Sequence, residues 1–272
     1  GGTNQNWMAA TKREGGDGFK FFSWDSDQIL RTRPNANVVS RGGPGGMWSP
    51  ISRHPEFKIL LADRAQKYFF NDGILTPDRV IEQWDELASR IELSMIAETA
   101  RWGNSDYTPT TITNALNDVK SWIIDPPGEG SRTSVVIGQL KAVGMFPNTV
   151  APTLLIDGTK QFGGEVFAGA RLSLASSDGV IYVTLDGSDP RLVGGDVNPD
   201  ATVYAGEEIS LLESTQVKAR IRAADGEWSP LSDAIYVVPG LPAPALSTLF
   251  LVLSWIASCT ALTPVGVRPL VS

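Results

Sequence analysis

Two acidic residues, Asp25 and Asp27, follow an aromatic run and carry the strongest chemical signal in the sequence. Residues 19–24 read Phe-Lys-Phe-Phe-Ser-Trp, a pattern that predicts a mostly buried β-strand. Because residues two apart in an extended chain share a face, both carboxylates are expected to point into the same space. Two such acids repel unless a cation lies between them, and oxygen ligands favour Mg²⁺, Mn²⁺ or Ca²⁺. The alternative is that Asp25 caps a turn or helix while Asp27 is solvated.

A polar turn rich in glycine, at residues 13–18, separates this strand from an earlier run at residues 4–10. Two runs joined by such a turn predict a hairpin, which would bring Asn6 near Asp25. The following residues 31–50 are rich in Gly, Pro and Asn. Their glycine run lacks the Lys-Ser/Thr ending of a phosphate-binding loop, so a surface loop is predicted.

Charge and composition exclude several classes of protein. A net charge of −7 over 272 residues, with no basic run, argues against binding to nucleic acid. A single cysteine, Cys259, and a single histidine, His54, exclude an internal disulfide, a Cys/His zinc set and a Ser-His-Asp triad. Since His54 precedes proline, it is predicted to begin a helix. The start at Gly1, without methionine or leader, leads us to expect a piece of a longer protein.

Helical periodicity dominates the middle of the chain. Helices are predicted at residues 55–70, 111–124 and 131–143, and a further helix begins with Thr76 as its cap, followed by proline. The apolar stripe of this further helix, spaced four, three, four and four residues apart, is predicted to be core: Val80, Trp84, Leu87, Ile91 and Met95. Together the helices predict a compact helical subdomain.

After residues 147–152 the periodicity changes from helical to two-residue, which places a domain boundary there. Short strands separated by Asp-Gly and Gly-Gly turns predict a small all-β sandwich, with strands at residues 171–174, 180–185, 216–222 and 234–238.

Three stretches of this region, residues 179–191, 214–220 and 226–232, resemble the C-terminal domain of chitobiase and related β-hexosaminidases. The resemblance implies an immunoglobulin-like accessory module of secreted bacterial proteins, without catalytic residues of its own. Asp186, Ser188 and Asp189 have the residue types of a turn, because Asx side chains bond the backbone two residues on. A calcium site at these residues is the alternative.

Other stretches lie in the first part of the chain: Asn6-Trp7, residues 21–27, residues 54–57 with Asp63-Arg64, and residues 69–77. With them, roughly residues 1–146 resemble the C-terminal portion of the CotH kinase family, known from bacterial spore-coat proteins and large secreted proteins. The resemblance implies transfer of phosphate from ATP to Ser or Thr hydroxyls, with ATP and Mg²⁺ as cofactors. In such reactions the metal neutralises the charge that develops on the phosphates.

By this resemblance Asp25 corresponds to the metal-binding aspartate of the kinase fold, with Asp27 beside it in the functional signature. Asn6 corresponds to the asparagine that helps to hold a second ion. The resemblance also implies a catalytic aspartate a few residues before Asn6, where residues 1–3 are Gly-Gly-Thr. No catalytic residue is therefore expected in this chain, and the fragment itself is expected to be inactive.

We therefore predict an α+β chain, with a mainly helical C-terminal part of a kinase-like domain followed by an all-β immunoglobulin-like sandwich. The kinase-like part is predicted at residues 1–146, helical from about residue 53. The sandwich is predicted at residues 152–238 and an apolar tail at residues 239–272.

Two functions stay open from the sequence. The first is a secreted or cell-surface atypical kinase that acts on Ser or Thr of a protein substrate. The second is a non-catalytic surface or matrix protein whose sandwich serves adhesion or contacts cell-surface polysaccharide. An exposed flat aromatic strip would favour the second, although packing in the core or in turns is the first interpretation for each candidate: Tyr182, Tyr204, Trp228 and Tyr236.

The tail has no charged residue before Arg268, and residues 246–262 are apolar over roughly the minimal length of a membrane span. In outline it resembles bacterial surface-sorting tails. We interpret it as a weak membrane-associated segment, so that residues 246–262 would contact the membrane of a secreted or cell-surface protein. A tail without a biological role, including one produced by a shifted reading frame, is the alternative.

Overall fold

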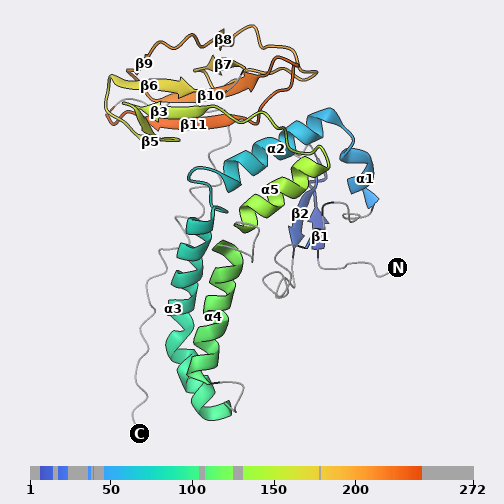
Figure 1. Ribbon diagram of the computed structural model, residues 1–272, viewed down its shortest axis with the longest axis vertical. Coiled ribbons are helices and arrows are strands. Elements are labelled where there is room, and N and C mark those ends of the chain that lie inside the picture. The colour runs from blue at the N-terminus through green and yellow to red at the C-terminus, as the bar shows by residue number, and fades with distance from the viewer. Residues whose placement is uncertain are drawn as a thin grey trace.

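The computed structural model describes residues 7–14, 18–23, 36–37, 39, 46–103, 108–124, 131–177 and 179–240. Of the described residues, 37% are helical and 24% lie in strands, and these strands form three sheets (Figure 1). The predicted fold class, a mainly helical part followed by an immunoglobulin-like sandwich, is therefore wrong, and only its α+β character holds in part. Three of the strands have two residues each, which is too short for a two-residue period to reveal them.

The first sheet is a hairpin of β1 (Trp7–Ala10) and β2 (Lys20–Ser23). The strands are antiparallel, with Met8 opposite Phe22, so the predicted hairpin is confirmed. The prediction that its aromatic strand is mostly buried is wrong, since Phe21 and Phe22 are exposed. A two-stranded sheet has two faces, and burying both requires a layer on each side.

Five helices follow among the described residues: α1 (Trp48–Ile51), α2 (Pro55–Phe69), α3 (Pro77–Trp102), α4 (Pro109–Ile124) and α5 (Arg132–Ala142). The last four confirm the predicted helices to within two residues at each predicted end. The short helix α1 falls in the segment predicted to be a loop, because four residues carry no helical period.

The helix starts follow local capping chemistry. The ring Nδ1 of His54 accepts a 3.2 Å hydrogen bond from the Glu56 amide, which confirms the structural role predicted for His54. Ser131 caps α5 by accepting from the Ser134 amide. Thr76 is the N-cap residue of α3 as predicted, but its hydroxyl donates to the Gly73 carbonyl, 2.8 Å away, rather than capping the helix.

Helices α2 and α5 pack together around a small apolar core (Figure 1). Its buried members are Ala62, Ala65, Ile137, Leu140, Met145 and Phe146. Aromatic rings close the core at its edges, with Phe70 stacked on Phe146 at 6.0 Å between ring centroids. This core fixes the position of α2, the helix that meets the β-sheets.

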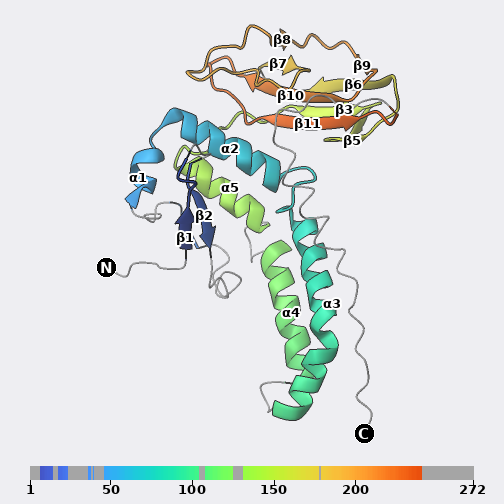
Figure 2. The same ribbon diagram turned by 180° about the vertical axis from the view of Figure 1, so that it is seen from behind.

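Helices α3 and α4 form a long hairpin that projects away from the rest of the molecule (Figures 1 and 2). The predicted core stripe of α3 is only partly covered: Val80, Trp84 and Met95 are half-buried, whereas Leu87 and Ile91 are exposed. No residue of α3 is fully buried. The prediction that this stripe is core is therefore wrong for the described structure.

The remaining strands form two sheets that share one core. The five-stranded sheet has the order β5-β11-β10-β7-β8, from Gly164–Glu165, Ser232–Val237, Thr215–Arg222, Val180–Thr184 and Thr202–Val203. The four-stranded sheet has the order β4-β3-β6-β9, from Thr159–Lys160, Thr153–Ile156, Ala170–Ala175 and Ile209–Leu211. The four predicted strands are confirmed as β6, β7, β10 and β11.

Alternation decides which side chains enter this sandwich core. On β6, Ala170, Leu172 and Leu174 are buried and the residues between them are more exposed. On β10, Val217, Ala219 and Ile221 enter the same core. In both views the sandwich lies along α2, with β11 near the helix (Figures 1 and 2). Among the described residues, no helix combines the length and apolar character needed to cross a bilayer.

Candidate functional site at the joint between α2 and the sandwich

The predicted metal ligands Asn6, Asp25 and Asp27 lie outside the described residues, as does the tail segment 246–262. Their predicted roles stay predictions. Within the described ranges, His, Cys, Asp and Glu side chains form no group of three or more that could hold a metal ion. The charged groups that the structure does bring together lie instead between α2 and the sandwich.

Arg220, on strand β10, is the centre of this site. Its sequence neighbours Ala219 and Ile221 point into the sandwich core, so Arg220 lies on the opposite face of the strand. There it extends to helix α2, and only 1% of its surface is exposed. Burying an unpaired guanidinium would cost several kcal/mol, so the side chain requires acidic partners.

Two aspartates supply those partners. Asp63 on α2 accepts hydrogen bonds from both terminal nitrogens of Arg220 at 2.7 and 2.8 Å. Asp189, between β7 and β8, accepts from Nε and from one terminal nitrogen, both at 2.7 Å. The Ser229 carbonyl accepts the remaining bond at 2.9 Å. All five guanidinium N–H groups are therefore satisfied.

The acids themselves are also fixed. Asp63 Oδ1 accepts a further 2.8 Å hydrogen bond from the Leu231 amide, and Asp189 Oδ1 accepts from the Arg191 amide at 2.9 Å. Burial alone would raise the pKa of Asp189, but the hydrogen bonds and charge of Arg220 outweigh it and lower that pKa. Likewise, burial would lower the pKa of Arg220, and its two acidic partners raise it above the ordinary value.

A second ion pair joins the same two parts of the chain. Arg191 donates two hydrogen bonds to Glu56 at the start of α2, each 2.7 Å long, in a bidentate arrangement. The Gly194 amide donates to the same carboxylate at 3.0 Å. The bonds from Arg191 and Gly194 lower the pKa of Glu56 to about 2. We refer to Glu56, Asp63, Asp189, Arg191 and Arg220 as the joint.

The loop between β7 and β8, residues 185–201, presents two members of the joint. Trp228 Nε1 donates to the Gly195 carbonyl at 2.7 Å, and Asn198 Nδ2 donates to the Asp189 carbonyl at 2.9 Å. Asp186 accepts from the amide and hydroxyl of Ser188, which confirms the predicted turn chemistry. Since Asp189 is engaged by Arg220, the calcium alternative loses one of its ligands.

A third contact fixes the connection between the two parts. Glu227 Oε2 accepts three hydrogen bonds from residues that follow α5, at 3.1 Å from the Asn148 amide, 2.9 Å from the Thr149 amide and 2.6 Å from the Thr149 hydroxyl. Glu227 thus attaches residues 148 and 149, within the predicted domain boundary, to the sandwich.

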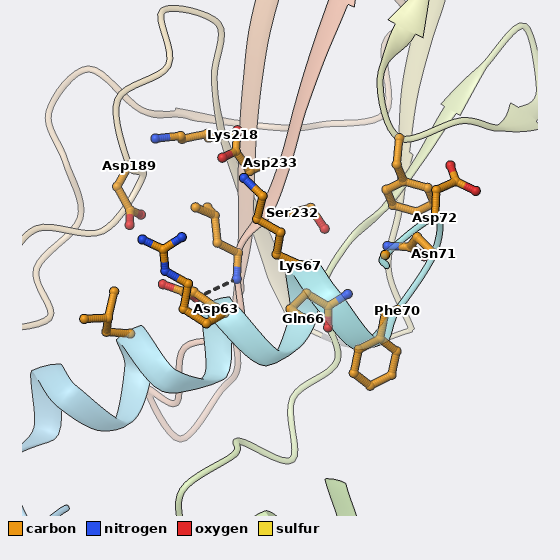
Figure 3. A pocket seen from close by; sticks show the side chains of 15 residues that line it. Asp63, Gln66, Lys67, Phe70, Asn71, Asp72, Asp189, Lys218, Ser232 and Asp233 are labelled. Carbon is orange, nitrogen blue, oxygen red and sulfur yellow. Dashed lines mark hydrogen bonds between the residues drawn. The ribbon is translucent and has the colours of Figure 1, made fainter. Parts of the chain in front are cut away.

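Beside the joint, α2 and strands β10 and β11 enclose a cavity of about 420 Å³ (Figure 3). Basic and acidic side chains both line it, and Figure 3 shows Lys67 and Asp63 on the helix opposite Lys218 and Asp233 of the sandwich. Ser232, which also lines the cavity, is buried, and its hydroxyl donates a 2.6 Å hydrogen bond to the Pro152 carbonyl. That hydroxyl is therefore engaged in structure and is not available as a nucleophile.

The four aromatic residues considered for polysaccharide contact do not form an exposed strip. Trp228 and Tyr236 are buried, and Tyr182 and Tyr204 are half-buried. Tyr236 donates its hydroxyl to the Gln161 carbonyl at 2.7 Å, and burial raises its pKa. The interpretation of these residues as packing is confirmed.

Sequence patterns did not identify the joint. Asp63-Arg64 and Arg191 entered only as parts of resemblances, and Arg220 only as the end of a matching stretch. The sequence of β10 did contain a signal, because the charged residue Arg220 stands between Ala219 and Ile221, which both face the core. Comparison of the chain with protein-family models, curated proteins and solved structures finds no match.

Proposed function

We propose that this chain is the C-terminal part of a secreted or cell-surface CotH-type kinase, and that its sandwich is a non-catalytic module fixed against the kinase-like part. The observation that supports a fixed module is the bonding of Arg220. Its five donors are divided between Asp63 on α2 and acceptors of the sandwich, so a rotation of one part would leave buried charge unpaired. The module then orients what it contacts relative to the kinase-like part.

In this proposal, phosphate passes from ATP to a Ser or Thr hydroxyl of a protein substrate. Asp25, Asn6 and Asp27 are the residues that would hold Mg²⁺, as the resemblance implies. Their oxygen atoms suit a hard cation, and the ion would neutralise charge on the phosphates. The catalytic aspartate would precede Asn6.

The proposal is tested in the complete protein by Asp25→Asn. Loss of one carboxylate should abolish Mg²⁺-dependent phosphate transfer while folding stays nearly unchanged. The exposed loop residue Asp200 provides the control, since Asp200→Asn should retain activity. Wild-type turnover of Asp25→Asn at saturating Mg²⁺ would show that Asp25 is not a ligand. Residues 1–272 alone should show no autophosphorylation, and detectable autophosphorylation would refute the expected position of the catalytic aspartate.

The proposal includes an extracytoplasmic location with membrane contact through residues 246–262. Fusion of residues 239–272 to a soluble reporter tests the membrane contact. Recovery of the reporter in the carbonate-resistant membrane fraction supports it, and a reporter found only in the supernatant excludes it.

A further inference from the structure

Another cavity, of about 410 Å³, lies where α1, the start of α2 and the segment after α5 meet (Figures 1 and 2). Its described lining residues are Val39, Trp48, Ser49, Ser52, Arg53, Lys58, Val143 and Met145. Cavities of roughly 300–1,000 Å³ are typical of sites that bind small molecules. The cavity beside the joint has acidic and basic side chains in its lining, whereas the described lining of this one includes two cations and no carboxylate.

The two cations have no acidic partner among the described residues. Neither the guanidinium of Arg53 nor the ammonium of Lys58 takes part in a hydrogen bond or an ion pair there. Lys58 is half-buried, so it loses part of its hydration without gaining a carboxylate. It also borders a neighbouring cavity that contains Glu227, but that carboxylate is bound by donors of Asn148 and Thr149. The positive charge of the cavity is therefore free to attract an anion.

The apolar wall of the cavity is held in place by contacts of its own. The indole Nε1 of Trp48 donates to the Val39 carbonyl at 2.8 Å, and its ring meets that of Phe57 edge-on, with 5.8 Å between the centroids. Met145 is buried in the core that α2 and α5 share. Because these side chains are already fixed, a ligand does not have to order them when it binds.

We infer that this cavity binds a small anion with an apolar group, that is, a carboxylate or a phosphate carried on a short hydrocarbon chain. The anionic group lies between Arg53 and Lys58, whose donors form charge-assisted hydrogen bonds with carboxylate or phosphate oxygens. The hydrocarbon lies against Trp48, Val143 and Met145, where it is removed from water. This inference does not depend on the proposed kinase activity.

The test uses residues 1–272 with hexanoate, hexyl phosphate and uncharged hexanamide as probes. NMR titration follows the indole signal of Trp48, which the Trp48→Phe variant identifies. We expect the better of the two anions to bind at least about tenfold more tightly than hexanamide, because only an anion can pair with Arg53 and Lys58. The anion that binds more tightly identifies the preferred group. Acetate and inorganic phosphate should bind at least about tenfold more weakly than their hexyl counterparts, since they bury no chain.

The double substitution Arg53→Gln/Lys58→Gln tests the two cations. It should weaken binding of the preferred hexyl anion by at least about tenfold. Arg64→Gln/Lys67→Gln is the matched control, because it removes the same charge from exposed positions of α2 outside this cavity, and binding should be retained.

A second variant, Val143→Glu, places a carboxylate in the cavity. Val143 is an exposed residue of the lining, so the change should be tolerated, and the new acid should compete with the ligand for the cations. It should also weaken binding of the hexyl anion by at least about tenfold. Circular dichroism verifies that each variant remains folded.

Four outcomes would overturn the inference. The first is a Trp48 signal that responds to none of the probes, and the second is equal binding of hexanamide and both hexyl anions. The third is unchanged binding to the Arg53→Gln/Lys58→Gln variant. The fourth is an equal loss in the Arg64→Gln/Lys67→Gln control, since net charge rather than the cavity would then explain the binding.

Discussion

The joint and the α3–α4 hairpin both depart from the usual distribution of residues, because the joint buries a charged side chain and the hairpin exposes apolar ones. In the joint an arginine is almost completely buried, whereas in the hairpin leucine and isoleucine are about half exposed. The buried charge is tolerated because two aspartates of the same chain accept four of its five hydrogen bonds and the Ser229 carbonyl accepts the fifth. Among the described residues, no other part of the chain buries Leu87 and Ile91 of the α3 stripe. The comparison shows that burial follows which surfaces meet, rather than residue type alone.

The largest effect is expected from Arg220→Ala. This change leaves Asp63 and Asp189 as unpaired acids in the joint, which should lower the free energy of unfolding by about 3–5 kcal/mol. Urea denaturation measures the loss. Lys218→Ala, on the same face of β10, is the control and should cost less than about 1 kcal/mol. A loss below 1 kcal/mol for Arg220→Ala would mean that the joint contributes little to stability.

A second expected effect concerns the sandwich expressed alone as residues 151–240. It should fold, since its core is formed by its own strands. It lacks Asp63, however, so Arg220 loses two acceptors, and we expect it to be about 2 kcal/mol less stable than the sandwich in the full chain. Urea unfolding of the two proteins compares them. Equal stability would show that α2 and the sandwich are independent, and an unfolded fragment would exclude a separate domain.

The joint should also weaken in acid. The folded-state pKa of Glu56 is lowered from 4.5 to about 2, so its stabilising effect is complete above pH 4.5 and is lost as the pH falls towards 2. Because the pair is partly exposed, we expect Glu56→Gln to remove roughly 1 kcal/mol of this pH-dependent stability. Unfolding free energies at several pH values test this. Glu207→Gln removes a carboxyl elsewhere, and an identical profile for both variants would contradict the role of Glu56.

The smallest effect is expected in the hairpin, from Arg90→Ala. Arg90 pairs with Glu86 one turn away, and both side chains are mostly exposed. Such a pair contributes about 0.3–0.5 kcal/mol, so the change in unfolding free energy should stay below 1 kcal/mol. Thermal denaturation of this variant and of Arg220→Ala places the exposed and the buried ion pair on one scale. A loss comparable to that of Arg220→Ala would remove the contrast between them.

Periodicity predicted the elements that carry several repeats of their pattern. Helix α2 and strand β10 follow from their spacing, and His54 from the proline after it. The two-residue strands escaped prediction because their pairing is set by distant partners, as when β5 pairs in parallel with β11. Sequence spacing also could not show that part of the apolar stripe of α3 is exposed. An apolar stripe indicates that a helix can pack against another surface, but not whether that surface is present.

The joint was beyond sequence reasoning for a different reason. Asp63 and Arg220 are 157 positions apart, and each is an ordinary surface residue type in its own element. Their meeting depends on how α2 is placed on the sandwich, which no local pattern encodes. Asn6, Asp25 and Asp27, which did form a local pattern, lie outside the described residues.

The bonding of Arg220 also has an evolutionary consequence. A chain that loses Asp63 keeps a buried cation with half of its carboxylate partners, and a chain that loses Arg220 keeps two acids facing one another. Either single change is costly, whereas replacing all three residues by apolar side chains of similar volume costs little. Descendants of a common ancestor should therefore retain positions 63, 189 and 220 together or exchange them together, and intermediates that carry only one replacement should be rare.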